Sequence, residues 1–204
     1  MKYLVALSLL VWANVAFGEA TSVNWTSVKT QGAAGEQSLT LNKSAAPGTT
    51  TAISIEPRLG GVTKLRAVFN ESVGLTGSPI VVRHVLTGAT SSPIEVSLAP
   101  DGLSLDLLLG ALPNGGCYEV TLSGKISGTA SGTDRNVYFR NLLGDVNSDG
   151  VVDMTDALMI KGKIALVPSG SNAKYDGTAN GQLNLGDALL ARSQLGQKSV
   201  CPQS

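Results

Sequence analysis

The feature that most constrains this chain is a short polar segment near its C-terminal end that is repeated 31 residues later. The first copy runs from Asp145 to Asp156 and the second from Asp176 to Asp187, and each has glycine at its sixth position. An Ala-Leu dipeptide follows each copy and continues into an apolar stretch. Chance turns do not recur with the same sequence behind them, so the repeat predicts two equivalent loop–helix units.

Both loops carry oxygen ligands at the spacing that calcium requires. Side chains at loop positions 1, 3, 5, 9 and 12 and the carbonyl at position 7 converge when the chain turns sharply at the glycine. The expected ligands are Asp145, Asn147, Asp149, Val151, Asp153 and Asp156 in the first loop, and Asp176, Thr178, Asn180, Gln182, Asn184 and Asp187 in the second. The first loop has four carboxylates and the second has two, which predicts two Ca²⁺ sites, the second weaker. The alternative is a turn rich in Asp, Asn and Gly that binds no metal.

The charge pattern agrees with a cation site and excludes a nucleic-acid partner. Fifteen basic residues balance fifteen acidic residues, yet six of the nine aspartates lie between Asp145 and Asp187. A neutral chain without a basic cluster lacks the electrostatic footprint of a nucleic-acid-binding protein.

The first eighteen residues have the pattern of a signal peptide. Lys2 precedes an apolar run from Tyr3 to Ala16, and small residues precede a cleavage point before Glu19. No later apolar run reaches the ~18 residues of a membrane span. We therefore expect an exported chain, either secreted or at the cell surface. In an oxidising compartment Cys117 and Cys201 can form a disulfide, and the alternative is two free thiols.

The region before the loops predicts an antiparallel β-sandwich over residues 51–143. Short alternating segments recur there between turn sequences such as Pro-Asp-Gly and Pro-Asn-Gly. The expected strands are Ala52–Glu56, Lys64–Phe69, Ile80–Leu86, Ile94–Leu98, Ser104–Leu109, Tyr118–Leu122 and Val137–Arg140. Residues 19–50, rich in Ser, Thr, Ala and Gly, are expected to be a separate N-terminal segment with one or two weak strands, such as Ser38–Asn42. Residues 144–204 then form the calcium-binding domain.

Two parts of the chain resemble known families. The stretches from Lys64 to Val73 and from Asp101 to Val120 resemble bacterial immunoglobulin-like domains of secreted proteins, which implies a fold and no particular activity. No helix enters the first loop, because the residues before it have a strand pattern, and position 12 is Asp in both copies. Both features resemble the dockerin type I domain, in which each EF-hand-type repeat is a calcium loop followed by one helix. The expected fold class is therefore mainly β with a small α domain.

The resemblance to dockerins implies a protein partner of the cohesin type. The expected recognition residues lie at loop positions 10 and 11 and on the following helices: Met154, Thr155, Lys161, Leu185, Gly186 and Arg192. Alternatively, Met154 and Leu185 pack between the repeats and the two basic residues are only solvated. The copies differ at positions 10 and 11, which argues against a symmetric, two-orientation binding mode. The apolar pattern predicts one buried helix face after each loop, formed by Leu158, Met159, Ile160 and Ile164 in the first repeat and by Leu189, Leu190 and Leu195 in the second.

The sequence therefore predicts a secreted, non-catalytic protein that attaches to a cohesin or scaffold, in a polysaccharide-degrading or cell-surface assembly. The first alternative is a β-sandwich for carbohydrate binding or adhesion, with the calcium module as a stabilising cap. Sugar sites need exposed aromatic rings, and few aromatic residues follow the signal segment. The second alternative is a small glycoside hydrolase accessory subunit. The single histidine, His84, and scattered carboxylates do not form a catalytic pattern, so we do not expect an enzyme.

Overall fold

The computed structural model describes residues 23–49, 52–127 and 135–201, and the signal peptide expected at residues 1–18 lies outside them. The described part is mainly β. Its strands are β1 (Val23–Thr30), β2 (Glu36–Leu41), β3 (Ser54–Glu56), β4 (Lys64–Phe69), β5 (Gly74–Leu75), β6 (Val82–His84), β7 (Thr90–Ser91), β8 (Glu95–Leu98), β9 (Ser104–Leu108), β10 (Cys117–Thr121), β11 (Ile126–Ser127) and β12 (Asn136–Asn141). Two α-helices, α1 (Met154–Lys161) and α2 (Leu185–Ser193), and two 3₁₀ turns, η1 (Gly32–Ala34) and η3 (Gly170–Tyr175), complete it. None of these helices is long and apolar enough to cross a membrane.

Two five-stranded sheets enclose the main core. Their strand orders are β2-β1-β4-β9-β8 and β3-β12-β10-β6-β7, and a small β5–β11 pair lies apart from them. Only β3 and β12 pair in parallel among the described strands. Trp25 and Leu105 from the first sheet meet Val120 and Phe139 from the second in one buried cluster. Apolar residues from both sheets therefore share a single interior, as in a β-sandwich.

All seven strands predicted for residues 51–143 are present, but the structure does not separate residues 23–49 from the sandwich. Strand β1 pairs with β4 from Val23 opposite Phe69 to Ser27 opposite Leu65. The indole of Trp25 is fully buried. The sandwich therefore begins well before residue 51.

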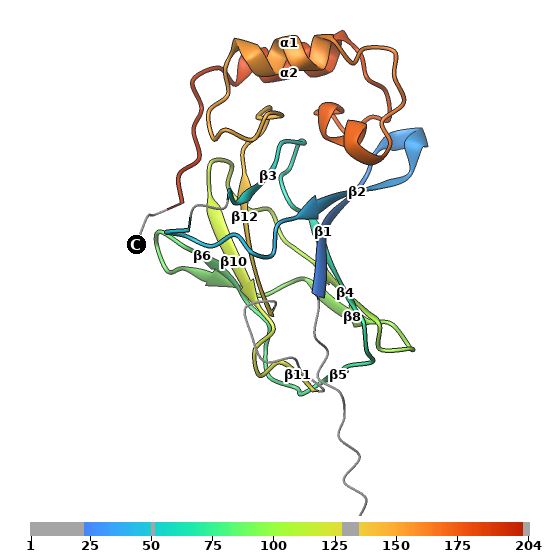
Figure 1. Ribbon diagram of the computed structural model, residues 1–204, viewed down its shortest axis with the longest axis vertical. Coiled ribbons are helices and arrows are strands. Elements are labelled where there is room, and N and C mark those ends of the chain that lie inside the picture. The colour runs from blue at the N-terminus through green and yellow to red at the C-terminus, as the bar shows by residue number, and fades with distance from the viewer. Residues whose placement is uncertain (1–22, 50–51, 128–134, 202–204) are drawn as a thin grey trace, which may run out of the picture.

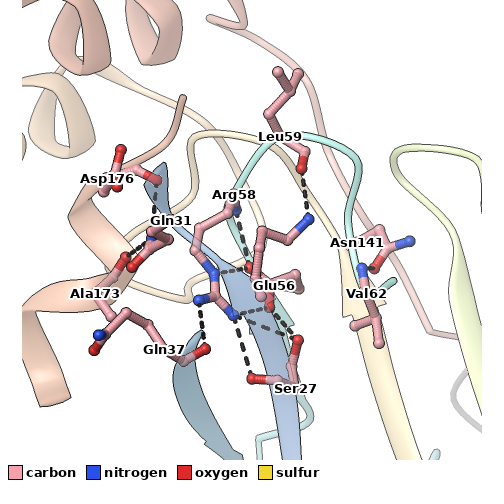
Figure 2. Close-up of polar contacts among 11 residues, drawn as sticks. Ser27, Gln31, Gln37, Glu56, Arg58, Leu59, Val62, Asn141, Ala173 and Asp176 are labelled. Atoms are coloured by element: carbon pink, nitrogen blue, oxygen red, sulfur yellow. Dashed lines mark hydrogen bonds and ion pairs between the residues drawn. The ribbon is translucent and has the colours of Figure 1, made fainter. Parts of the chain in front are cut away.

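A buried ion pair explains why the sequence pattern did not reveal β1. Ser27 and Lys29 occupy inward positions on this strand, and both are buried although they are polar. The Ser27 hydroxyl donates to the carboxylate of Glu56, and Lys29 Nζ donates to the Leu59 carbonyl at 2.6 Å. Glu56 in turn accepts two hydrogen bonds of 2.7 Å from the Arg58 guanidinium, as Figure 2 shows. Ser27 and Lys29 are each satisfied by a residue distant in sequence, so no local periodicity marks the strand.

Cys117 and Cys201 form a disulfide, with their Cα atoms 5.3 Å apart. The bond joins the first residue of β10 to the C-terminal tail. It lies against Ala45 and Ile53 in a small buried cluster. The alternative of two free thiols is therefore wrong for this structure.

The C-terminal part sits on one end of the sandwich with its two helices outermost. Figure 1 shows α1 and α2 side by side at this end, and the β5–β11 pair at the other. A second core of seven buried residues holds the helices and loops together: Val146, Ala157, Ile160, Tyr175, Leu183, Ala188 and Ala191. A fourth cluster of Ile55, Leu142 and Val152 joins this part to β3 of the sandwich.

Replacing Arg58 by methionine should strongly destabilise the protein. The Glu56 carboxylate and the Arg58 guanidinium both have 0 % exposure, so the variant leaves a buried carboxylate without its cation. We expect a loss of about 3–5 kcal/mol in the free energy of unfolding. Urea denaturation followed by Trp25 fluorescence measures it.

The matched control is Arg66→Met on the outer face of β4. Arg66 also makes a two-point contact with a carboxylate, at 2.6 and 2.7 Å from Asp106, but both side chains are about one-third exposed. Water screens such a pair, so we expect a loss of about 1 kcal/mol or less. Equal losses in the two variants would contradict the role assigned to the buried pair.

Candidate metal centre

The first loop places two acidic residues in its interior, at positions 1 and 12. Asp145 and Asp156 both have 0 % exposure. The Asp145 carboxylate accepts hydrogen bonds from the backbone N–H groups of Ser148 and Gly150, at 2.7 and 2.8 Å. Asp156 Oδ1 accepts from the N–H of Val146 at 2.9 Å, next to Asp145 in the chain. The turn of the loop therefore brings its first and last carboxylates together.

The second loop has a similar arrangement. Asp176 and Asp187 are likewise fully buried. Asp176 Oδ2 accepts from the N–H of Gly181 at 2.8 Å, as Asp145 does from Gly150. Asp187 Oδ1 accepts from the N–H and the hydroxyl of Thr178, at 3.0 and 2.8 Å. Threonine at position 3 thus directs its hydroxyl to the closing carboxylate.

The backbone also has the same path in both loops. Position 4 is left-handed in each, with φ of 66° at Ser148 and 56° at Ala179. Position 6 is left-handed as well, with φ of 92° at Gly150 and 86° at Gly181. Non-glycine residues adopt such angles only when the surrounding structure imposes them. The shared strain at position 4 indicates that both loops close around the same kind of centre.

The residue at position 9 of each loop caps the N-terminus of the following helix. The side chain of Asp153 accepts from the N–H of Thr155 at 2.6 Å, and Asn184 accepts from Gly186 at 2.7 Å. The residue at position 12 completes a capping box in both helices. The predicted helices after each loop are therefore present.

The structure brings together some of the predicted ligands and leaves others apart. Asp149 lies at the surface, where it accepts from the N–H of Val151 and from Asn147 Nδ2, at 2.9 and 2.7 Å. Asn180 in the second loop binds the N–H of Gln182 in the same way, at 2.9 Å. Among the described residues, no three His, Cys, Asp or Glu side chains converge to hold a metal ion. Positions 1 and 12 thus form the centre of each loop, and positions 5 and 9 face its rim.

The electrostatics of the buried carboxylates favour a cation. The pKa of Asp145 is raised to about 6, chiefly by burial. Backbone hydrogen bonds from Gly150 and Ser148 act to lower it, and the nearby carboxylates of Asp156 and Asp149 act to raise it. Burial, and then the charge of Asp187, likewise raise the pKa of Asp176. Within the described part of the chain, none of the four buried carboxylates has a Lys or Arg ion pair.

The chemistry of the donors fits calcium. Each loop offers carboxylate, amide or hydroxyl oxygens and a backbone carbonyl, and calcium prefers such hard oxygen ligands. A bound divalent cation would offset the burial of the two acidic groups in each loop. Lys174 of η3 lies beside the first loop, where its Nζ donates to the Val146 carbonyl at 2.7 Å. Sequence reasoning missed this residue, because its contact crosses from one repeat to the other.

The second loop also rests on the sandwich, which the sequence did not predict. Gln31, at the end of the β1–β2 strand pair, donates from Nε2 to the carbonyls of Ala173 and Asp176 at 2.8 and 3.3 Å (Figure 2). The N–H of Leu59 donates to the carbonyl of Gly177 at 2.7 Å. These contacts span more than a hundred positions, so no local signal could have found them.

The outer faces of the two helices do not match the predicted burial. In the first repeat Ile160 is buried, but Leu158 is 59 % exposed and Ile164 is 37 % exposed. In the second repeat Leu189 and Leu195 are also exposed, so the predicted buried faces are wrong in part. Small residues instead take the inward positions, such as Ala157 in α1 and Ala188 in α2. The helices pack closely through these small side chains, which turns the larger ones outward.

All six predicted recognition residues lie at the surface. Met154 is 50 % exposed and Leu185 is 58 % exposed, so neither is buried between the repeats as the alternative required. The remaining four are also exposed: Thr155, Lys161, Gly186 and Arg192. Leu158 and Leu189, at equivalent places in the repeats, extend this surface.

The paired loops, each followed by one helix, have a counterpart among known families. Residues 143–196 match the dockerin type I domain. This dockerin domain is the C-terminal part of the chain and follows the β-rich region. Domains of this type bind calcium. No curated protein matches the chain.

Replacing Gly181 by alanine should destabilise the protein by disturbing the packing of the second loop against the sandwich. A Cβ at this position would lie 2.6 Å from the Gln31 carbonyl oxygen and 3.0 Å from the Ala33 nitrogen, which are backbone atoms. Backbone cannot move aside as a flexible side chain can, so we expect a loss of more than about 2 kcal/mol in the free energy of unfolding.

Gly170→Ala is the control, because Gly170 has a positive φ of 51° but nothing within 4 Å of its Cβ position. It reports only the left-handed strain, about 1 kcal/mol. Urea unfolding of both variants measures the difference. If Gly181→Ala lowered the free energy of unfolding no more than Gly170→Ala, the packing of the second loop on the β1–β2 turn would not contribute to stability.

Proposed function

We propose that this chain is an exported, non-catalytic protein that attaches to a cohesin-type partner through a dockerin domain folded around two calcium ions. One observation carries the proposal. Large apolar side chains at equivalent positions of α1 and α2 are exposed together, on the outer helices of the C-terminal part. An attachment surface of this kind explains them, whereas the interior of the domain does not.

The exposed apolar residues lie on both helices, which pack against each other, and we propose that they form one surface. Leu158 and Leu189 are 59 % and 51 % exposed, and Met154 and Leu185 have similar exposure. Exposure of this much apolar surface on two short helices is unfavourable in an isolated protein and is typical of interaction sites. Burial of such side chains against a partner contributes to affinity, and the flanking Lys161 and Arg192 would contribute to its specificity.

The two helices that carry this surface run in opposite directions. The N–H of Ala165, after α1, donates to the carbonyl of Leu183, two residues before α2, at 3.0 Å. The end of α1 therefore lies beside the beginning of α2, so the repeats are related by an approximate two-fold rotation. Their differing residues, Met154-Thr155 against Leu185-Gly186, favour one docking orientation over the other.

Two calcium ions are proposed, with the first loop binding more tightly. The first loop has four carboxylates among its ligand positions and the second has two. Ligand charge is a main determinant of calcium affinity in such loops. Because a small domain has a small core, binding energy at these loops becomes folding energy.

We propose that the sandwich is immunoglobulin-like. In that fold one sheet has strands A, B, E and D, and the other has G, F, C and C′. Apart from the edge strands β2 and β3, the orders β1-β4-β9-β8 and β12-β10-β6-β7 follow the same sequence of strands along the chain. This agreement supports the fold and implies no activity of its own.

Export and the absence of catalysis are proposed on separate grounds. The Cys117–Cys201 disulfide supports an oxidising compartment such as the extracellular space. His84 supports a structural role, because its Nδ1 accepts from the N–H of Thr87 at 3.2 Å and its ring packs on Tyr118. No described aromatic residue is classed as exposed, which weighs against a carbohydrate-binding surface.

Calorimetry on the full chain should detect two bound calcium ions. Asp149→Ala and Asn180→Ala each remove an exposed ligand at position 5 without disturbing the buried carboxylates. We expect each variant to lower the calcium affinity of one of the two sites by about tenfold or more. Asp149→Ala should affect the tighter site. No binding heat at about 1 mM calcium would refute the calcium proposal.

A double variant Leu158→Glu/Leu189→Glu should abolish binding to a cohesin partner. Binding of the full chain to a panel of cohesin modules, measured by surface plasmon resonance with calcium present, tests this. The expected loss is at least about a hundredfold, because charge replaces apolar contact at the centre of the surface. The control Val68→Glu/Leu108→Glu places the same charges on exposed sandwich residues and should leave affinity unchanged. Retained binding by the helix variant would place the docking surface elsewhere.

A further inference from the structure

The C-terminal tail pairs with the first calcium loop after α2 ends. The N–H of Gly196 donates to the carbonyl of Val152, and the N–H of Val152 donates to the carbonyl of Gln197, both at 2.9 Å. The N–H of Ser199 donates to the carbonyl of Gly150 at 3.1 Å. We call the segment Gln197–Cys201 the strap. It binds the backbone on both sides of loop position 7.

The other side of the strap is fixed to the sandwich. Arg140 of β12 donates from Nη1 to the carbonyl of Ser199 at 3.0 Å and from Nη2 to the carbonyl of Ile53 at 3.2 Å. The strap ends at Cys201, which the disulfide joins to Cys117 of β10. The strap thus lies between the first calcium loop and the sandwich, with a covalent bond at its end.

The pairing geometry gives the strap a specific effect on position 7. Val151 and Lys198 form an antiparallel bridge, flanked by the bonds at Gly150 and Val152. In such a non-hydrogen-bonded pair, the N–H and C=O of Val151 point away from the strap. Accordingly, the N–H of Val151 donates to Asp149 Oδ1 within the loop at 2.9 Å. The strap therefore directs the position-7 carbonyl, a calcium ligand in the proposed function, away from itself.

The second loop has no such strap. The bond from Gly196 to Val152 has an equivalent in the bond from Ala165 to Leu183, and both donors are left-handed, with φ of 83° and 72°. The equivalence ends there, because Pro168 occupies the place of Ser199 and has no N–H to donate.

We propose that the strap, closed by the Cys117–Cys201 disulfide, positions the Val151 carbonyl and sets the calcium affinity of the first loop. This inference rests on the proposed calcium function. Reduction by a thiol compound transfers two electrons and two protons to the cysteine sulfurs, while two reductant thiols become a disulfide. The reduced strap loses its covalent anchor, and the first loop loses a constraint on one ligand. The second loop is unaffected, because it has neither the strap nor the bond.

The effect must also act in reverse. If the disulfide strengthens calcium binding by some factor, calcium must stabilise the disulfide against reduction by the same factor. A disulfide that only tethered the tail would not respond to calcium. This reciprocity separates a positioning role from a merely structural one.

Calorimetry of the oxidised full chain and of a Cys117→Ser/Cys201→Ser variant provides the first test. We expect the affinity of the first loop to fall by about tenfold or more in the variant, and that of the second loop to stay the same. Asp149→Ala assigns the heats to their loops. The variant Ser199→Pro keeps the disulfide but removes the hydrogen bond to Gly150. It should also lower the calcium affinity of the first loop only. Circular dichroism checks that each variant is folded.

The second test measures the thiol–disulfide equilibrium of the unmodified chain in glutathione buffers, with calcium and with a chelator. We expect calcium to shift the equilibrium toward the disulfide by the same factor, and Asp149→Ala to reduce that shift. Equal equilibria in calcium and chelator, while the oxidised chain still binds two ions, would overturn the inference and leave the calcium function standing. Failure of the oxidised chain to bind calcium would overturn both.

Discussion

The C-terminal part of this protein depends on the burial of four carboxylates, two in each loop. Asp145, Asp156, Asp176 and Asp187 are fully enclosed, and backbone N–H groups are their main hydrogen-bond donors. Burying an uncompensated charge costs several kcal/mol, whereas a cation held between such groups reverses that cost. The same carboxylates at position 12 also start the helices through their capping boxes. Loop closure, helix initiation and the outward presentation of α1 and α2 therefore share one electrostatic requirement.

The sandwich serves as the base on which these loops are held. The second loop contacts the β1–β2 turn through Gln31, and the first is connected to β12 and β10 through Arg140 and the disulfide. Anchoring the loops leaves the helices as the outer surface of this end of the molecule (Figure 1). A rigid base reduces the conformational entropy lost when a partner binds the helices, which favours affinity. In the proposed function, the sandwich thus supports docking as a rigid base for the helices.

Local sequence pattern predicted the elements whose signal is local. The two loops, their helices and seven strands follow from ligand spacing, glycine placement and alternation. Strand β1 escaped prediction because Ser27 and Lys29 are inward residues whose partners are distant in sequence. The helix faces were misassigned because alanines, such as Ala157, occupy the buried positions, so hydrophobicity did not mark burial. The contact of Gln31 with Ala173 depends on tertiary packing alone, and single-sequence reasoning has no access to it.

The two repeats are alike where they face each other and differ where they meet the rest of the chain. The left-handed residues Ala165 and Gly196 make equivalent bonds to opposite loops. Beyond them, one segment runs through Pro168 to the next repeat, and the other becomes a strap against the sandwich. Alanine in the left-handed region costs about 1 kcal/mol that glycine avoids. The first repeat therefore makes its equivalent bond, through Ala165, at some expense to stability. The internal symmetry therefore belongs to the loop–helix unit, and the asymmetry comes from its attachment to the sandwich.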